Sequence, residues 1–131
     1  MSLEQRPDES NDAWLDRLDR LAGESRGWTR DDSWVVGFWR DGDSVAYFRP
    51  TKFVEHNFEF QIWTIAKVGW RVYIEALREA VYDGMTEAEH NNMEAIDDGN
   101  ADWEYRLATA PPLPRVLAAL AALNKENADA N

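Results

Sequence analysis

The sequence predicts a small single-domain α+β protein, in which an antiparallel sheet of three to four strands carries amphipathic helices packed on one face. Three observations predict this class. The length of 131 residues suits one domain, and the hydrophobic fraction of 44% is sufficient for a core. Runs of alternating β-prone residues are also interleaved with segments of helical periodicity. We expect the domain to span residues 11–124, between a flexible N-terminal tail (1–10) and a frayed C-terminal tail (125–131).

Four segments predict helices. A short amphipathic helix is expected over residues 14–21, with Gly23 as its stop signal, because apolar residues recur there at helical spacing. The same spacing predicts helices over 70–82 and 113–123, which should supply most of the apolar cover of the sheet. A Thr-x-x-Glu capping box predicts a further helix over 86–96, of which most residues are polar.

A β-hairpin is the clearest local unit of the sequence. Its strands are expected over residues 34–39 and 44–49, joined by a two-residue turn at Asp41-Gly42. An Asp-Gly pair between two β-prone runs is a strong hairpin signal, because glycine readily adopts the positive φ that tight turns require.

Two further segments complete the expected sheet. Residues 57–65 alternate between two sets of side chains, so we predict a third strand there, after Pro50 interrupts the hairpin pattern. Residues 103–107 are the candidate for a fourth strand. The sheet would then have three or four antiparallel strands.

Acidic residues are concentrated in one segment. The formal net charge of the chain is −11, and the segment from Asp83 to Glu104 contributes −8, because it contains eight carboxylates and no Lys or Arg. A field of one sign attracts basic protein surfaces and repels phosphates, so we expect no direct binding to nucleic-acid phosphates. The eight carboxylates are Asp83, Glu87, Glu89, Glu94, Asp97, Asp98, Asp102 and Glu104.

The composition limits the cellular compartments and the kinds of reactive site that the sequence allows. The sequence contains no cysteine, which excludes disulfides, thiolate catalysis and zinc bound by cysteine. The first ten residues lack the apolar core of a signal peptide, and no apolar run approaches the roughly 18 residues that span a bilayer. We therefore expect a cytoplasmic protein with no membrane contact.

Three partial motifs fail on their spacing or context. A Glu-x-x-His pair ending at His90 is half of a di-iron motif, but the sequence around His56 lacks the second half. The alternating acidic residues from Asp98 resemble a calcium loop, but Trp103 stands where that loop needs glycine. Ser44 begins a hairpin strand and so does not form a nucleophile elbow. We therefore predict no catalytic residue, no metal site and no cofactor.

These observations favour a non-enzymatic acidic protein-protein interaction module that binds a basic partner surface, as inhibitors, immunity proteins and chaperones do. Seven tryptophans are more than a core of this size needs, and tryptophan is enriched among interface hot spots. We therefore expect Trp34 and Trp39 to contribute to partner binding together with the eight carboxylates.

Three alternatives remain open. Carboxylates arranged like phosphates would make the chain a DNA-mimic inhibitor of a nucleic-acid-binding protein. The expected hairpin register places Gly37 opposite Ala46, between Trp39 and Phe48, and such a notch would suit a small ligand or a sugar, in a binding domain or a hydrolase. A structural component of an assembly would instead form a homo-oligomer.

Overall fold

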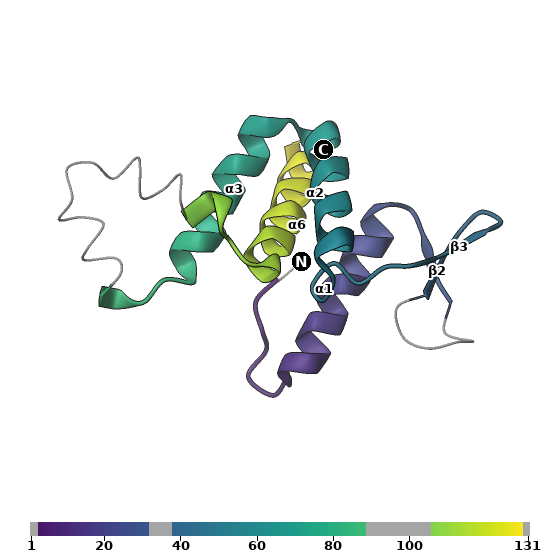
Figure 1. Cartoon of the computed structure of the whole chain (residues 1–131), viewed down its shortest axis with the longest axis horizontal. Coiled ribbons are helices and arrows are strands. Elements are labelled where there is room, and N and C mark those ends of the chain that lie inside the picture. The colour runs from purple at the N-terminus through teal and green to yellow at the C-terminus, as the bar shows by residue number, and fades with distance from the viewer. Residues whose placement is uncertain (1–2, 32–37, 89–105, 130–131) are drawn as a thin grey trace.

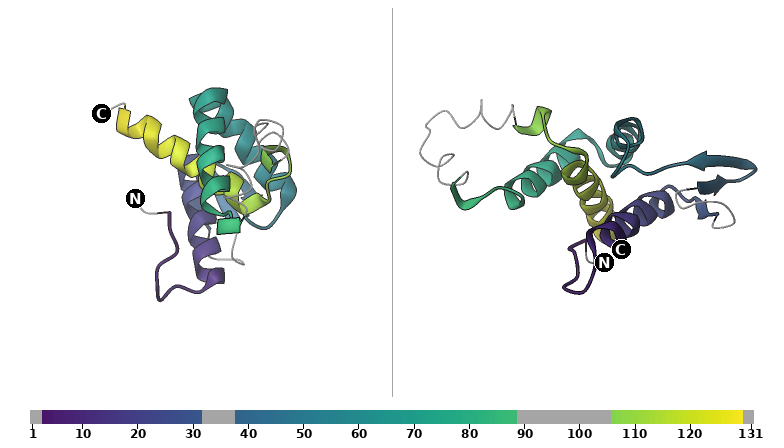
Figure 2. Two further views of the ribbon diagram at one scale, coloured as in Figure 1. Left: turned by 90° about the vertical axis from the view of Figure 1, so that its left-hand side faces the viewer. Right: turned by 60° about the horizontal axis from the view of Figure 1, so that its bottom comes forward.

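The computed structural model describes residues 3–31, 38–88 and 106–129, and it confirms the α+β class. Within these ranges the chain forms four helices of 14 to 18 residues and a three-stranded antiparallel sheet (Figure 1). The β2–β3 hairpin extends from one end of the helical body (Figure 2). The elements are α1 (Asn11–Ser25), β1 (Thr29–Arg30), β2 (Phe38–Asp41), β3 (Ser44–Tyr47), α2 (Val54–Val68), α3 (Trp70–Asp83) and α6 (Pro112–Asp129).

Helix α6 lies in the middle of the helical body, where it contacts α1, α2 and α3 (Figure 1). The predicted helix over 113–123 is confirmed, and it continues to Asp129, through part of the expected C-terminal tail. Many of its buried side chains are small, which allows neighbouring helices to approach closely. The buried residues are Val116, Ala118, Ala119, Leu120, Ala122 and Leu123.

Helix α1 is longer than the sequence predicts. The Ser10 side chain caps its N-terminus by accepting a hydrogen bond from the Ala13 amide at 3.1 Å. The expected stop at Gly23 is wrong, because the helix continues to Ser25. The chain turns at Gly27, whose φ of 79° is a conformation that other residues rarely adopt.

Gly23 serves a different purpose, because it is the contact point between α1 and the sheet. A Cβ atom at this position would lie 2.5 Å from two atoms of the Trp39 ring. The Trp39 side chain is 2% exposed and belongs to the core. The indole ring therefore lies directly on the backbone of α1 and fastens β2 to the helical body.

Residues 3–10 contain no helix or strand, but they are bonded to α1. The Trp14 indole N–H donates to the Leu3 carbonyl at 3.0 Å, and Arg17 Nε donates to Glu9 Oε2 at 3.0 Å. The hydrogen bond from Arg17 lowers the pKa of Glu9 to about 2. The described part of the expected flexible tail is thus tied to the helix that follows it.

The hairpin predicted over 34–39 and 44–49 is confirmed in its described part, as strands over 38–41 and 44–47, but its turn is displaced by one residue. Residues 34–37 of the first predicted strand lie outside the described residues. Asp41 pairs with Ser44, so the two turn residues are Gly42 and Asp43, and the expected turn at Asp41-Gly42 is wrong. Gly42 has a φ of 60°, whereas no residue other than glycine has a positive φ among the described residues. A positive φ at the first turn position alone is what a type II′ turn requires.

The displaced turn changes which side chains face each other. Trp39 pairs with Ala46, and these two residues lie on the face of the sheet that α1 covers. Side chains alternate along a strand, so Val45 and Tyr47 lie on the opposite face, where both are exposed. Strand β1, which the sequence does not predict, pairs with β2 and completes the sheet in the order β1-β2-β3.

The predicted third strand over 57–65 is wrong, because this segment belongs to α2. Phe58 and Ile62, which a strand would place on the same face as Phe60, are 59% and 54% exposed. Apolar residues in this segment satisfy a period of 2 as well as a period of 3.6, and the helical period prevails. The buried polar and apolar residues of α2 recur at helical spacing: Asn57, Phe60 and Thr64.

Helix α3 confirms the helix expected over 70–82 and buries Tyr73 and Leu77. The expected role of this helix and of α6 as the main cover of the sheet is wrong, because they pack mainly on each other and on α2, and α1 contacts the sheet. Helix α3 follows α2 directly through Gly69, whose φ of 91° allows the sharp change of direction. Of the expected helix over 86–96, residues 87 and 88 are helical and the remainder from 89 lies outside the described residues. Residues 106–108 form a helical turn, so the candidate strand over 103–107 is not formed in its described part.

Asp19 of α1 forms hydrogen bonds with the segment that connects β3 to α2. Its carboxylate accepts hydrogen bonds from the Thr51 amide and hydroxyl, both at 2.8 Å, and from Arg49 Nε at 3.4 Å. Burial raises the pKa of Asp19, and the hydrogen bonds from Thr51 oppose this rise. The Arg49 amide also donates to His56 Nδ1 at 3.0 Å, which fixes the same connection to the first turns of α2.

The contact between Gly23 and Trp39 predicts that Gly23→Ala destabilises the fold. Overpacking costs about 1–3 kcal/mol, which outweighs the gain of about 1 kcal/mol that alanine brings to a helix. Urea unfolding followed by circular dichroism measures the change. Gly84→Ala is the matched control, since a Cβ there meets no atom closer than 3.6 Å. Equal losses in the two variants would contradict the proposed contact.

The Thr64 hydroxyl predicts a stabilising substitution. Thr64 is fully buried, and its Oγ1 atom has no hydrogen-bond partner among the described residues. Thr64→Val keeps the shape of the side chain and removes the unpaired hydroxyl, so the free energy of unfolding should rise by about 1 kcal/mol. Thr51→Val is the control and should destabilise, because it removes the hydroxyl that donates to Asp19. Thermal unfolding of both variants checks the opposite signs.

Candidate functional site

The predicted partner-binding residues occupy different positions in the structure. Asp83 and Glu87 are described, and both are exposed at or just beyond the end of α3. Trp39 is buried in the core, so its side chain is not available to a partner in this fold. Trp34 and six of the carboxylates lie outside the described residues; these carboxylates are Glu89, Glu94, Asp97, Asp98, Asp102 and Glu104.

Tryptophan contributes less to the described surface than its number suggests. Trp70, at the start of α3, is 58% exposed. Phe48 is only 1% exposed, so Phe48 and Trp39 are core residues and do not form the walls of an open notch. Three other tryptophans are partly buried against the core: Trp14, Trp28 and Trp63.

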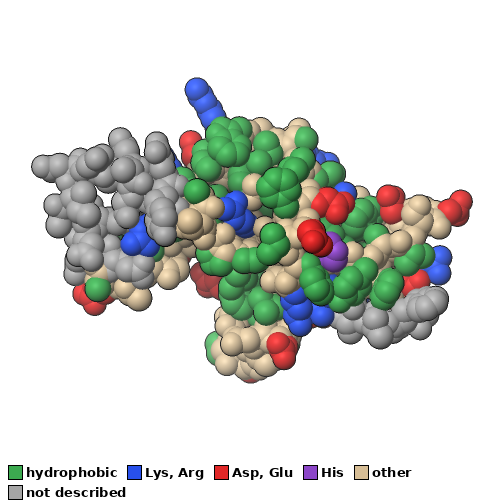
Figure 3. Space-filling model, in the orientation of Figure 1, with side chains coloured by type: hydrophobic (Ala, Val, Ile, Leu, Met, Phe, Trp, Pro, Cys, Tyr) green, Lys and Arg blue, Asp and Glu red, His purple; other side chains and the backbone are tan. Residues whose placement is uncertain are grey.

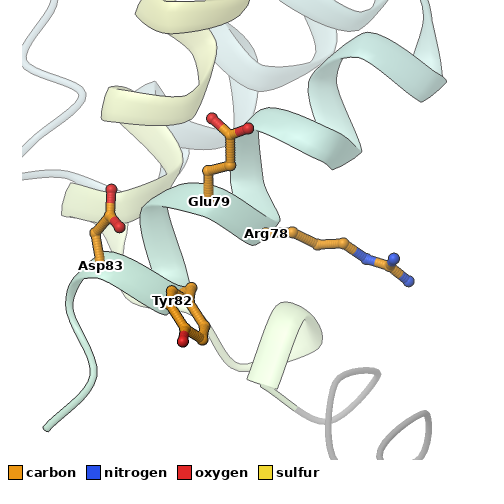
Figure 4. Close-up of a pocket in the computed structure, with 4 residues that line it drawn as sticks. All are labelled: Arg78, Glu79, Tyr82 and Asp83. Carbon is orange, nitrogen blue, oxygen red and sulfur yellow. The ribbon is translucent and has the colours of Figure 1, made fainter. Parts of the chain in front are cut away.

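The C-terminal end of α3 brings two carboxylates together. Glu79 and Asp83 are four residues apart, so their side chains lie on the same face of the helix, one turn from each other. Figure 4 shows both carboxylates on one side of the helix, with Arg78 directed away from them. A shallow pocket of about 400 Å³ at this end of the helix is lined by Arg78, Glu79, Tyr82 and Asp83. We call Glu79 and Asp83 the acidic end of α3.

The acidic end of α3 is not neutralised within the described part of the chain. Neither Glu79 nor Asp83 forms an ion pair with a described residue, and the last turn of α3 contains no basic residue. A helix C-terminus carries partial negative charge, so a carboxylate there costs about 0.3–1 kcal/mol. Like charges four residues apart also repel each other. A cationic group that binds here removes both penalties.

A groove of about 450 Å³ adjoins the acidic end of α3 and lies between α1, α3 and α6. Apolar side chains such as Trp14 and Leu117 line it, together with Glu4 and the two carboxylates of the acidic end. No Lys or Arg is among the described residues that line this groove. The negative surface thus continues from the helix end into a partly apolar depression.

The sequence does not predict Glu79 as a site residue, although its spacing of four from Asp83 is the signal that identifies it. It also does not predict the exposed apolar stripe of α2, because a strand would bury part of that set. The stripe consists of Val54, Phe58 and Ile62. Figure 3 shows hydrophobic side chains gathered over this face of the molecule.

The described residues were also compared with the arrangement that a metal site needs. Over 3–31, 38–88 and 106–129, no three His, Asp or Glu side chains are grouped to hold a metal ion. His56 Nδ1 accepts a hydrogen bond from the Arg49 amide, and the His56 ring contacts the rings of Tyr47 and Phe53. None of the described helices is both long and apolar enough to cross a membrane.

The position of Asp83 predicts that Asp83→Asn stabilises the fold by about 0.3–1 kcal/mol, because it removes a negative charge from a helix C-terminus. Asp12→Asn is the matched control, since Asp12 lies in the first turn of α1, where a carboxylate is favourable, and its loss should destabilise. Chemical unfolding at low ionic strength measures both effects, and added salt should reduce them. A loss of stability in both variants would contradict this electrostatic account.

The chain was compared with known proteins by sequence and by structure. No family model matches it, and neither a curated protein nor a solved structure does so.

Proposed function

We propose that this chain is a non-enzymatic acidic protein-protein interaction module that binds a basic surface of a partner protein. The observation that carries the proposal is the acidic end of α3, where Glu79 and Asp83 are exposed and have no cationic neighbour within ion-pair distance among the described residues. Unpaired charges of one sign accelerate encounters with an oppositely charged protein and disfavour wrong partners.

The sequence extends the same charge beyond the end of the helix. Asp83 is the first of the eight carboxylates in the segment to Glu104, which contains no Lys or Arg and carries a charge of −8. The acidic end of α3 is therefore continuous in sequence with the most acidic segment of the chain. An inhibitor, an immunity protein or a chaperone that covers a basic surface would use such a segment.

The energetics of the acidic end support a binding role over a purely structural one. Carboxylates at a helix C-terminus lower the stability of the free protein. A partner that supplies Lys or Arg relieves the electrostatic repulsion at the helix C-terminus. The free energy that this repulsion costs the free protein is therefore recovered on binding and increases the affinity. The adjoining groove adds apolar surface that a partner can cover, and charge alone rarely supplies tight binding.

The test is affinity capture from a lysate of the source organism, with charge reversal as the variable. One variant carries Glu79→Lys and Asp83→Lys. The matched control carries Glu24→Lys and Glu75→Lys, which change the net charge equally at exposed positions outside the groove. Captured proteins are identified by mass spectrometry, and the affinity of each purified candidate is then measured at low and high salt.

We expect a basic partner that the wild type and the control bind, and that the variant of the acidic end binds at least about tenfold more weakly, since two charge pairs are lost. Equal losses in both variants would mean that only net charge matters and would overturn the proposal. Competition by duplex DNA for the same partner would identify the chain as a DNA mimic, which is a special case of the proposed function.

A further inference from the structure

A cation and an amide meet between α6 and α2, beside pockets that the acidic end of α3 does not line. Arg115 of α6 donates to three backbone carbonyl oxygens, those of Leu107, Ala108 and Ala110, at 2.8–3.0 Å. Its Nη1 donates to Gln61 Oε1 at 2.7 Å. Arg115 forms no ion pair with any carboxylate in the described part of the chain, so its charge is held in place but not neutralised.

The orientation of the Gln61 amide follows from its neighbours. Arg115 can only donate, so the atom of Gln61 that faces it must be the oxygen. The Tyr73 hydroxyl donates to the same oxygen at 2.8 Å, and burial raises the pKa of Tyr73 to about 12, so this hydroxyl remains protonated. The Gln61 amide nitrogen is therefore turned away, and its two N–H groups have no partner among the described residues.

Two pockets adjoin this pair of residues. One has a volume of about 250 Å³ and is lined by residues that include Val54 and Phe58 of the α2 stripe. The other has a volume of about 360 Å³ and is lined by residues that include Trp70 and Leu107. Gln61 and Arg115 line both pockets, so this polar pair stands between two largely apolar spaces. Apolar walls with a few convergent polar groups are typical of small-molecule sites.

We propose that Gln61 and Arg115 form a binding site for a small carboxylate with an aromatic or branched apolar body. The carboxylate accepts hydrogen bonds from the Gln61 amide nitrogen and from the remaining N–H of Arg115 Nη1. Four of the five N–H groups of Arg115 are used by the protein, which leaves this one for a ligand. The apolar body of the ligand lies against the hydrophobic walls of the adjoining pockets.

The charge of Arg115 is what favours an anion over a neutral acceptor. A guanidinium without a carboxylate partner interacts more strongly with an ionised acceptor than with an alcohol or an amide. The carbonyl oxygens around Arg115 also hold the guanidinium in one orientation, so little further ordering is needed when a ligand binds. This inference does not depend on the proposed protein-binding function, because it uses neither Glu79 nor Asp83.

Nuclear magnetic resonance of the full chain labelled with nitrogen-15 tests the site. Three probes share one apolar body and differ in one group: 3-phenylpropionate, 3-phenylpropan-1-ol and 3-phenylpropylamine. We expect 3-phenylpropionate to shift the side-chain amide signals of Gln61 saturably, with an affinity about tenfold higher than that of the alcohol. Equal binding of the alcohol, preferred binding of the amine, or no saturable shift with the carboxylate would each overturn the proposal.

The variant Gln61→Glu separates ligand binding from folding. Its carboxylate still accepts hydrogen bonds from Arg115 and Tyr73, so the fold should be retained, which thermal unfolding checks. It lacks the two amide donors and neutralises the guanidinium, so the affinity for 3-phenylpropionate should fall about tenfold or more. Unchanged affinity in the folded variant would show that the carboxylate binds elsewhere, and the assignment of Gln61 and Arg115 would be wrong.

Discussion

The close packing of α6 against three other helices is the constraint on which the rest of the fold depends. Helix α6 buries three alanines, Ala118, Ala119 and Ala122, and these small side chains let α1, α2 and α3 surround it. Both candidate sites follow from this arrangement. Helix α3, which ends at the acidic pair, lies against one side of α6, and Arg115 projects from the first turns of α6 to Gln61 on α2. Disturbing α6 therefore displaces both surfaces together.

Several elements could be predicted from the sequence because local periodicity and long-range packing agree there. The helices over 70–82 and 113–123 have one apolar face each, and the hairpin has a clear turn signal. Over 57–65 local periodicity is ambiguous, because the apolar residues fit the period of a strand as well as that of a helix. The packing of α2 against α6 selects the helix over the strand, and this packing cannot be predicted from the local sequence pattern. The prediction that Gly23 ends α1 is wrong for the same reason. The role of Gly23 depends on its contact with the Trp39 indole, sixteen residues further along the chain.

The two candidate sites differ in how much of each can be predicted from the sequence. Negative charge is additive along a chain, so the acidic segment that begins at Asp83 is evident without a structure. The exposure of a side chain depends on the whole fold and cannot be summed along the sequence. The number of tryptophans therefore suggests a surface position for Trp39, whereas the structure places it in the core. The pairing of Gln61 with Arg115 joins residues that are 54 positions apart, and neither belongs to a recognisable motif. Only the fold brings these two side chains into contact.

The contact between Gly23 and Trp39 also restricts how this architecture can change over evolutionary time. A side chain larger than hydrogen at position 23 has no room while an indole occupies position 39. Substitutions at the two positions must therefore be correlated, with any gain of volume in the helix matched by a loss in the strand. A distantly related chain can thus be recognised by this compensated pair of volumes, even when the identity of the surrounding residues has been lost.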